Sequence, residues 1–194
     1  MIIIGLTGQT GAGKSTVCEI LKEKCIRSID CDKISREVTA DGAPALSEIE
    51  KAFGTVVVDG VLDRRKLGMI VFNDQDKKAV LEGILFPYII DEVKRRLNEL
   101  ESENAVILDA PTLFESGLYK ICDRILGVVA SEKSRLERIL MRDKIDELSA
   151  ITRMRAQPSE EWFSRHCDEV IKNDGGLHEL ECSLVPILKD WGVL

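Results

Sequence analysis

Short apolar runs alternate along the chain with longer stretches in which apolar residues recur at helical spacing. The runs lie at residues 2–7, 26–29, 105–108, 124–130 and, more briefly, 169–171. Runs that are apolar at nearly every position are typical of strands buried on both faces of a sheet. The pattern therefore predicts strands at these positions, paired in parallel.

Helical periodicity fills the stretches that follow these runs. In residues 14–24, Val17 and Leu21 face one way while charged residues face the other. Further helices are expected at residues 131–142, 146–157 and 177–189, the first of them N-capped by Ser131. Alternating strands and helices predict an α/β fold.

Between residues 33 and 101 the pattern becomes almost entirely helical. Helices are expected at residues 45–53, 64–72, 78–85 and 89–100, with a hairpin at residues 55–62. The Asp59-Gly60 pair suits the two-residue turn of such a hairpin. We interpret this block as a helical insertion into one α/β domain of 194 residues. The expected parts are a core (residues 1–32, 102–130 and 166–194), an insertion (about 33–101) and a lid region (about 131–165).

Charge and cysteine content narrow the function classes. Lys and Arg total 27 against 34 Asp and Glu, for a net charge of -7, and no basic block stands out, which disfavours a general nucleic-acid or anionic-membrane binder. The six cysteines form no C-x-x-C pair, which disfavours zinc and disulfide scaffolds and fits a reduced cytoplasmic setting. No apolar run approaches the roughly 18 residues of a membrane span, and no obligate protein partner is evident.

A phosphate-binding loop directly follows the first expected strand. Residues 8–16 read GQTGAGKST and match G-x-x-x-x-G-K-[ST] at every fixed position. The glycines allow backbone N–H groups to point inward, and the N-terminus of the following helix favours anions at the same place. Lys14 is expected to reach the β- and γ-phosphates, and the Ser15 hydroxyl to bind Mg²⁺. The residues expected to bind the nucleotide here are Gly8, Gly11, Ala12, Gly13, Lys14, Ser15 and Thr16. The alternative is a glycine-rich turn with an incidental lysine.

Two carboxylates follow the second expected strand. In a parallel sheet the carboxyl ends of the strands share one edge, so Asp30 and Asp32 should lie on the side of the phosphate-binding loop. A kinase needs a carboxylate near the acceptor hydroxyl to take its proton. We expect Asp32 to be this base and Asp30 to orient it or to bind a Mg²⁺-bound water. The alternative is that Asp32 only caps a helix over residues 33–39.

Three more charged residues are candidates for the same chemistry. Arg138 and Arg142 are four residues apart and therefore share one helix face, which suits a lid that closes over polyphosphate. The alternative is a solvated face on which they pair with Glu137 or Asp143. Asp109, at the end of the third expected strand, is a candidate for the second coordination shell of Mg²⁺, or only a turn residue.

Taken in order along the chain, further short motifs resemble the dephospho-coenzyme A kinase family. The motifs are Gly5-Leu6-Thr7-Gly8 leading to Gly13-Lys14-Ser15-Thr16, Ile29-Asp30-Cys31-Asp32 with Arg36, Gly42-Ala43-Pro44-Ala45-Leu46, Phe53-Gly54, Asp59-Gly60-Val61-Leu62-Asp63-Arg64 with Leu67, Val71-Phe72, Pro111 with Leu113-Phe114-Glu115 and Gly117-Leu118-Tyr119, Arg138, Arg142-Asp143, Arg153-Met154, Gln157, and Val170-Ile171 with Asn173 and Gly175. No single motif is specific, but their order and spacing are, and they cover nearly the whole chain.

The resemblance implies a P-loop NTPase fold of the nucleotide-kinase type in three layers, with a five-stranded parallel sheet, a helical substrate-binding lobe and a lid. It implies ATP and Mg²⁺ as cosubstrates and dephospho-coenzyme A as the acceptor, phosphorylated at its ribose 3′-hydroxyl. In the family the base matches Asp32 and the lid arginine matches Arg138, the same positions that the residues indicate. Arg64 becomes a candidate for the acceptor phosphates, and Phe114 and Glu115 for its nucleotide end.

The chain departs from the usual family pattern at a few positions. Phe86 precedes Pro87 where the family usually has histidine, which removes one candidate polar contact to the substrate lobe. Thr112 stands where leucine is usual, and Trp162 stands where a lysine tends to follow paired acids. Two other functions stay open: another small-molecule or nucleoside monophosphate kinase, and a nucleotide-gated binding module.

Overall fold

The computed structural model describes residues 1–72 and 74–194, which divide into two compact units. The core unit contains residues 1–29 and 101–194, and the insertion unit contains residues 30–100. The boundaries fall within a few residues of the change in hydrophobic pattern noted above.

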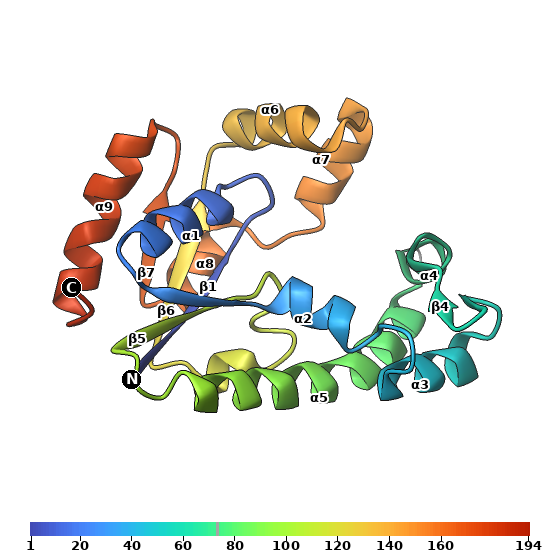
Figure 1. Cartoon of the computed structure of the whole chain (residues 1–194). Helices are drawn as coiled ribbons and strands as arrows, with labels where there is room; N and C mark the ends of the chain where they lie inside the picture. The colour runs from blue at the N-terminus through green and yellow to red at the C-terminus, as the bar shows by residue number, and fades with distance from the viewer. Residues whose placement is uncertain (73) are drawn as a thin grey trace. The chain divides into compact units, whose positions relative to one another are not determined.

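A five-stranded sheet forms the centre of the core unit (Figure 1). Its order is β2-β5-β1-β6-β7. The strands are β1 (Ile2–Gly8), β2 (Arg27–Asp30), β5 (Ala105–Asp109), β6 (Arg124–Val129) and β7 (Glu169–Lys172). β1 pairs in parallel with β5 and β6, and β6 pairs in parallel with β7. The five strands expected from the apolar runs are confirmed, and β1, apolar at nearly every position, lies at the centre.

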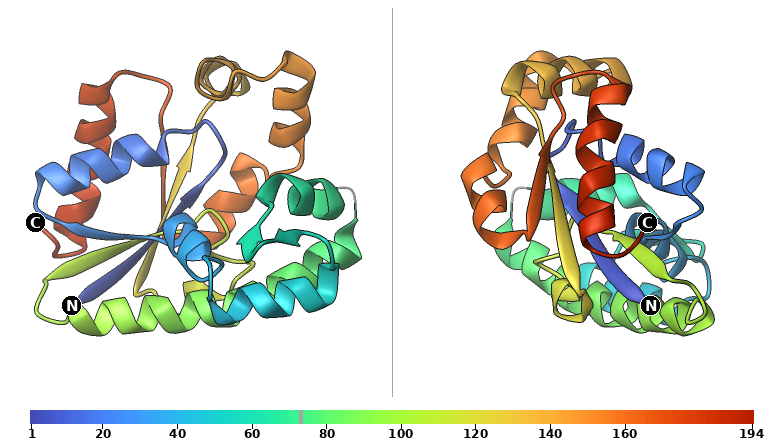
Figure 2. Two further views of the ribbon diagram at one scale, coloured as in Figure 1. Left: turned by 45° about the vertical axis from the view of Figure 1, so that its right-hand side comes forward. Right: turned by 90° about the vertical axis from the view of Figure 1, so that its left-hand side faces the viewer.

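Helices cover both faces of this sheet, which gives three layers. The helices of the core unit are α1 (Lys14–Glu23), α6 (Glu132–Asp143), α7 (Glu147–Arg155), α8 (Glu160–His166) and α9 (Leu177–Asp190), with a 3₁₀ turn η1 (Leu118–Ile121). Figure 2 shows α1 and α9 on one face and α8 on the other. The ranges expected for α1, α6, α7 and α9 are confirmed to within two residues.

Side chains that alternate between the two faces of each strand allow one sheet to pack against a layer of helices on either side. Ile4 and Leu6 of β1, together with Ile107 of β5, pack in one cluster with Leu184 of α9. Their neighbours Val106 and Leu108 are equally buried but, because successive side chains point to opposite faces, lie on the other side. Strands buried on both faces need apolar residues at every position, which is the pattern seen in the sequence.

The insertion unit is mostly helical. Its elements are α2 (Cys31–Glu37), α3 (Pro44–Phe53), β3 (Val57–Val58), β4 (Val61–Leu62), α4 (Arg64–Phe72) and α5 (Gln75–Glu99). The hairpin is confirmed: β3 and β4 pair antiparallel, and Asp59 and Gly60 both have the positive φ, 50° and 79°, that a two-residue turn requires.

The prediction of two separate helices at residues 78–85 and 89–100 is wrong. A single helix, α5, runs through Pro87. Proline removes one backbone donor from a helix, but tertiary packing can outweigh that cost. Here Leu81 and Leu85 pack against the apolar cluster of α3 and α4, and Val93 is fully buried in the second half. Both sides of the proline are therefore held in one helix by their contacts.

Helix α8 was not predicted from the sequence. It has only seven residues, of which Phe163 is the one buried apolar side chain, so its periodicity is too short to detect. Its start is marked by Ser159, whose side chain accepts a hydrogen bond from Trp162 N.

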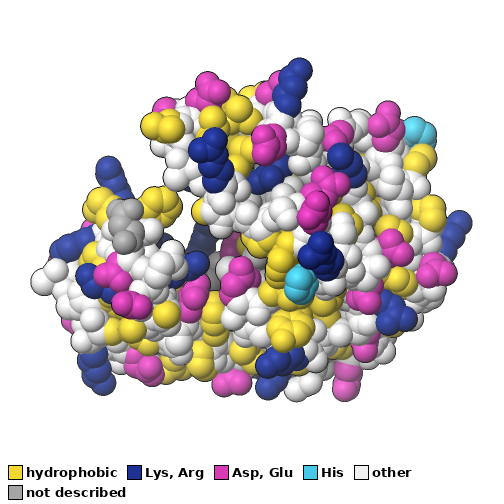
Figure 3. Space-filling model, turned by 180° about the vertical axis from the view of Figure 1, so that it is seen from behind, with side chains coloured by type: hydrophobic (Ala, Val, Ile, Leu, Met, Phe, Trp, Pro, Cys, Tyr) yellow, Lys and Arg dark blue, Asp and Glu magenta, His cyan; other side chains and the backbone are white. Residues whose placement is uncertain are grey.

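Acidic and basic side chains are interspersed over the face of the molecule that Figure 3 shows. All six cysteines are free thiols. Within the described residues, no helix is both long and apolar enough to cross a membrane.

Candidate functional site

The phosphate-binding loop, residues 8–16, connects the end of β1 to the start of α1. Gly11 and Gly13 adopt φ values of 75° and 100°, which favour glycine. A Cβ at Gly11 would lie 2.7 Å from the carbonyl oxygen of Arg135, and one at Gly13 would overlap the Asn173 side chain. The glycines are thus required by backbone conformation and by the close approach of α6 and the segment after β7.

The carbonyl groups of the loop are held by donors from outside it. Arg135 Nε donates to Thr10 O at 3.0 Å. Arg138 Nη1 donates to Gly11 O at 3.4 Å and to Ala12 O at 3.3 Å. The buried side chain of Asn173 donates to Ala12 O at 2.8 Å. Three successive carbonyl groups are therefore fixed on the outer side of the loop.

The N–H groups of the loop are placed for an anion. Within the described residues, those of Gly11, Gly13 and Ser15 have no hydrogen-bond partner, and they lie at the N-terminus of α1, where the helix dipole favours negative charge. Lys14 Nζ donates to Gly8 O at 3.2 Å, which holds its ammonium group over the loop. Backbone donors, a helix dipole and an ammonium group are the features that phosphate sites combine.

Two oxygen-bearing side chains lie at the same edge of the sheet. Ser15 is exposed in the first turn of α1, and Asp109 ends β5, in register with Leu6 of β1. Asp109 Oδ2 accepts a hydrogen bond from Cys18 Sγ at 3.4 Å. Among residues 1–72 and 74–194 no cluster of three His, Cys, Asp or Glu side chains could hold a metal ion. Hydroxyl and carboxylate oxygens nonetheless suit Mg²⁺, which takes one or two protein ligands when phosphates supply others.

Arg138 and Arg142, the two arginines of α6 expected to act in a lid, differ in their surroundings. Arg138 reaches the loop carbonyl groups described above. Arg142 is exposed and donates to Asp143 from Nε at 2.7 Å and from Nη2 at 3.0 Å. These bonds, together with the charge of Arg153, hold the pKa of Asp143 below its ordinary value. The structure therefore brings Arg138, but not Arg142, into contact with the phosphate-binding loop.

In the insertion unit, Asp30, the last residue of β2, and Asp32, two residues later, have different local roles. Asp30 is the N-cap of α2: its Oδ1 accepts a hydrogen bond from Lys33 N at 2.9 Å. The alternative that Asp32 caps this helix is wrong, because α2 begins at Cys31 and places Asp32 in the first turn. The Asp32 side chain is exposed and does not have to provide the cap.

Arg64 is positioned by α2 and the residues that follow it. Its Nη2 donates to Thr39 Oγ1 at 2.6 Å and to Arg36 O at 3.1 Å. The pKa of Arg64 is lowered by burial first and then by the like charge of Arg36. Neither arginine has an ion-pair partner within the described residues of the chain. Two such guanidinium groups form a local positive charge suited to an anion.

Phe114 belongs to an aromatic cluster in the core unit. Its ring lies 5.4 Å from that of Tyr119 and 4.8 Å from that of Trp162, and Trp162 stacks on His166 at 4.1 Å. Phe114 is half-buried, whereas the adjacent Glu115 is exposed. The cluster offers ring faces and one carboxylate beside each other.

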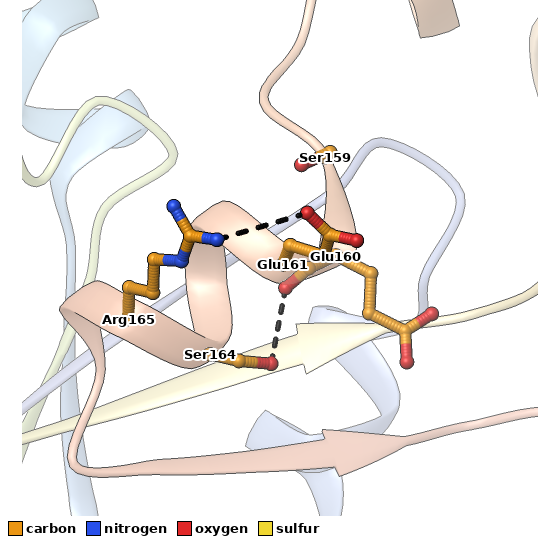
Figure 4. A pocket seen from close by; sticks show the side chains of 5 residues that line it. All are labelled: Ser159, Glu160, Glu161, Ser164 and Arg165. Atoms are coloured by element: carbon orange, nitrogen blue, oxygen red, sulfur yellow. Dashed lines mark hydrogen bonds and ion pairs between the residues drawn. The ribbon is translucent and has the colours of Figure 1, made fainter.

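An open pocket on α8 is shown in Figure 4. It is lined by Ser159, Glu160, Glu161, Ser164 and Arg165. Arg165 lies 4.0 Å from Glu161, and Ser164 Oγ donates to Glu160 O at 3.1 Å. All five residues are exposed residues of α8 or its N-cap, and none of them belongs to the phosphate-binding loop, residues 8–16.

The sequence did not indicate a role for Arg135, Gln157 or Asn173, although each contacts the phosphate-binding loop. Arg135 was identifiable only as a residue on the same face of α6 as Arg138, three positions earlier. Gln157 and Asn173 were noted as parts of motifs without a function. The contacts of all three with the loop span more than 120 residues of sequence, and local patterns carry no signal of such distances.

Comparison with known proteins gives a consistent result. A family model described as Dephospho-CoA kinase matches residues 2–179. A relative from Bacillus cereus, named Dephospho-CoA kinase, is 41% identical over 197 aligned positions that cover 100% of this chain and 98% of the relative. A solved structure, TT1252 from Thermus thermophilus, has a TM-score of 0.86 at 32% identity, covering 97% of both chains. The dephospho-CoA kinase from Campylobacter jejuni has a TM-score of 0.71 at 28% identity, covering 97% of this chain and 96% of that one. The chain therefore belongs to the dephospho-CoA kinase family.

Proposed function

We propose that this protein transfers the γ-phosphoryl group of ATP to the ribose 3′-hydroxyl of dephospho-coenzyme A, giving coenzyme A and ADP. The observation that carries the proposal is the phosphate-binding loop: its carbonyl groups at residues 10–12 are bonded outward, which leaves N–H groups for phosphate. Membership of a family named for this acceptor supports the choice of substrate over other small-molecule kinases.

The donor side of the reaction uses the core unit. Lys14 and the loop N–H groups bind the β- and γ-phosphates, where charge develops during transfer. Ser15 would bind Mg²⁺ directly, and Asp109 would act in its second shell. When bound, the metal neutralises phosphate charge. Arg138 adds a cation next to the loop. Arg142 would join it by leaving Asp143, which keeps its ion pair with Arg153.

The acceptor side uses Asp32 as the base. An exposed carboxylate that is not needed as a helix cap can accept the proton of the 3′-hydroxyl as the O–P bond forms. Asp30 caps α2 and so fixes where the helix begins, which places Asp32 in the first turn of α2. Arg64 would bind the phosphates of the acceptor, and Phe114 and Glu115 would contact its nucleotide end.

Replacing the base gives the direct test. In Asp32→Asn, turnover should fall about a hundredfold or more, because base catalysis contributes roughly that factor, while ATP affinity stays unchanged. Asp91→Asn is the matched control: it makes the same charge change at an exposed position of the insertion unit, and its turnover should equal that of the wild type. ADP release in the presence of dephospho-coenzyme A is the measurement. A fall of less than about threefold in Asp32→Asn would reject Asp32 as the base.

A further inference from the structure

The peptide groups on both sides of Thr10 are held by one pair of side chains. Thr10 N donates to Gln157 Oε1 at 2.6 Å, and Thr10 O accepts from Arg135 Nε at 3.0 Å. Arg135 Nη2 in turn donates to the same Gln157 Oε1 at 3.3 Å. The three residues form a closed ring of hydrogen bonds, and this ring fixes the direction of the loop backbone where it leaves β1.

Arg135 is an unusual residue to find in this ring. It is only 5% exposed, and within the described residues it makes no ion pair. A buried charge is costly unless other groups compensate for it. The two carbonyl-type oxygens of the ring do so in part, and burial still lowers the pKa of Arg135. The negative charge of a nucleotide polyphosphate on the loop would complete the compensation.

The ring also joins the loop to α6 and to the segment between α7 and α8. Arg135 lies in the first turns of α6, and Gln157 follows the end of α7. Next to the ring, Gln9 Nε2 donates to Pro158 O at 3.2 Å. Residues 9 and 10 of the loop are thus bonded to α6 and to residues 157 and 158, which lie between α7 and α8.

We propose that Arg135 and Gln157 are positioning residues for phosphoryl transfer, which hold Thr10 so that the loop has its phosphate-binding shape before the nucleotide arrives. Neither side chain has to touch the substrate. Their effect is to remove the cost of ordering the loop on binding, which is a gain in nucleotide affinity. The inference rests on the proposed function only in taking ATP as the ligand.

Two variants distinguish the effect of the hydrogen bonds in the ring from the effect of the positive charge at position 135. Gln157→Met removes the acceptor shared by Thr10 N and Arg135 Nη2 with little change in volume. Arg135→Lys keeps the positive charge but has one terminal nitrogen, which cannot reproduce the paired bonds to Thr10 and Gln157. Arg155→Lys, at an exposed position of α7, is the matched control for the second variant.

The measurement is the dissociation constant for ATP, obtained by calorimetry without an acceptor and well below the unfolding temperature of each variant. We expect an increase of about tenfold for Gln157→Met and for Arg135→Lys, the size of one lost hydrogen bond to a charged or buried group, and no change for Arg155→Lys. In turnover assays the KM for ATP should rise while the KM for the acceptor stays constant.

Two other results would contradict either the positioning role of Arg135 and Gln157 or the proposed function. ATP dissociation constants within about twofold of the wild type for both variants would overturn the proposal, even if both proteins unfold at lower temperature, because that is the result of a merely structural role. Wild-type protein that binds ATP but transfers no phosphoryl group to dephospho-coenzyme A would overturn the proposed function instead, and the comparison of affinities would still decide the role of Arg135 and Gln157.

Discussion

Alanine at Gly11 tests the contact between the phosphate-binding loop and α6. Gly11 and Gly117 both have a positive φ of nearly the same value, 75° and 77°. A Cβ at Gly117 would meet no heavy atom within 4 Å, whereas one at Gly11 would lie 2.7 Å from Arg135 O and 3.1 Å from Arg135 Cα. Alanine at either position therefore has the unfavourable positive φ, but only alanine at position 11 also overlaps neighbouring atoms.

The expected magnitudes follow from these geometries. An alanine in the left-handed region costs about 1–2 kcal/mol, part of which is offset because alanine has less freedom than glycine when unfolded. Gly117→Ala should lower the free energy of unfolding by about 1 kcal/mol. Overlap with helix backbone, which cannot move aside as a flexible side chain can, adds about 1–3 kcal/mol. Gly11→Ala should therefore lower the free energy of unfolding by about 2–4 kcal/mol.

Urea denaturation followed by tryptophan fluorescence suits this comparison. The chain has 2 tryptophans, Trp162 and Trp191, and both lie in the core unit with Gly11 and Gly117, so the signal reports the unit that carries both substitutions. Two variants whose free energies of unfolding agree within about 0.5 kcal/mol would refute the close approach of α6 to the loop.

Two further predictions concern titratable groups. Arg95 Nε donates to Glu92 Oε2 and Arg96 Nε donates to Glu92 Oε1, each at 2.8 Å, and these bonds lower the pKa of Glu92 from 4.5 to about 2. The ionised Glu92 carboxylate therefore stabilises the insertion unit at pH values above its unfolded-state pKa, and this stabilisation is lost as the pH falls through about 2. Glu92→Gln should destabilise the protein near neutral pH and progressively less between pH 4.5 and 2 in urea titrations; a difference from wild type that does not change with pH would contradict this. Burial raises the pKa of the Cys122 and Cys167 thiols to about 12, whereas Cys25 and Cys182 are exposed. An aromatic disulfide reagent should modify Cys25 and Cys182 quickly in the folded protein and Cys122 and Cys167 only on unfolding; one common rate for these four thiols would be the contrary result.

The sequence was most informative where local patterns decide the structure. Apolar runs located the central strands β1, β5 and β6 because strands covered on both faces are apolar at nearly every position. The spacing of Gly8, Gly13 and Lys14 located the turn between β1 and α1 because that turn needs glycine conformations next to a helix start. The Asp59-Gly60 turn was predicted for the same reason: its positive φ values restrict the residue types.

Features that depend on contacts distant in sequence could not be predicted. Pro87 indicated a helix boundary, but packing on both sides of it keeps α5 continuous. By residue type, Asp30 and Asp32 were equally suitable as helix caps. Asp30 is the cap because α2 begins at Cys31, the residue that follows it. The closed ring joins Thr10 to residues 125 and 147 positions later in the chain, so neither spacing nor periodicity could reveal that Arg135 and Gln157 contact it.

Phosphoryl transfer from ATP to a panel of acceptors tests the central claim most directly. Dephospho-coenzyme A, adenosine monophosphate and shikimate would each be incubated with ATP, Mg²⁺ and the wild-type protein, and the products identified by mass spectrometry and phosphorus NMR. The proposed function predicts rapid formation of coenzyme A, phosphorylated at the ribose 3′-oxygen, with kcat/KM for dephospho-coenzyme A exceeding that for the other acceptors by about a hundredfold or more. Equal transfer to another acceptor, or ATP binding with no transfer to dephospho-coenzyme A, would contradict it.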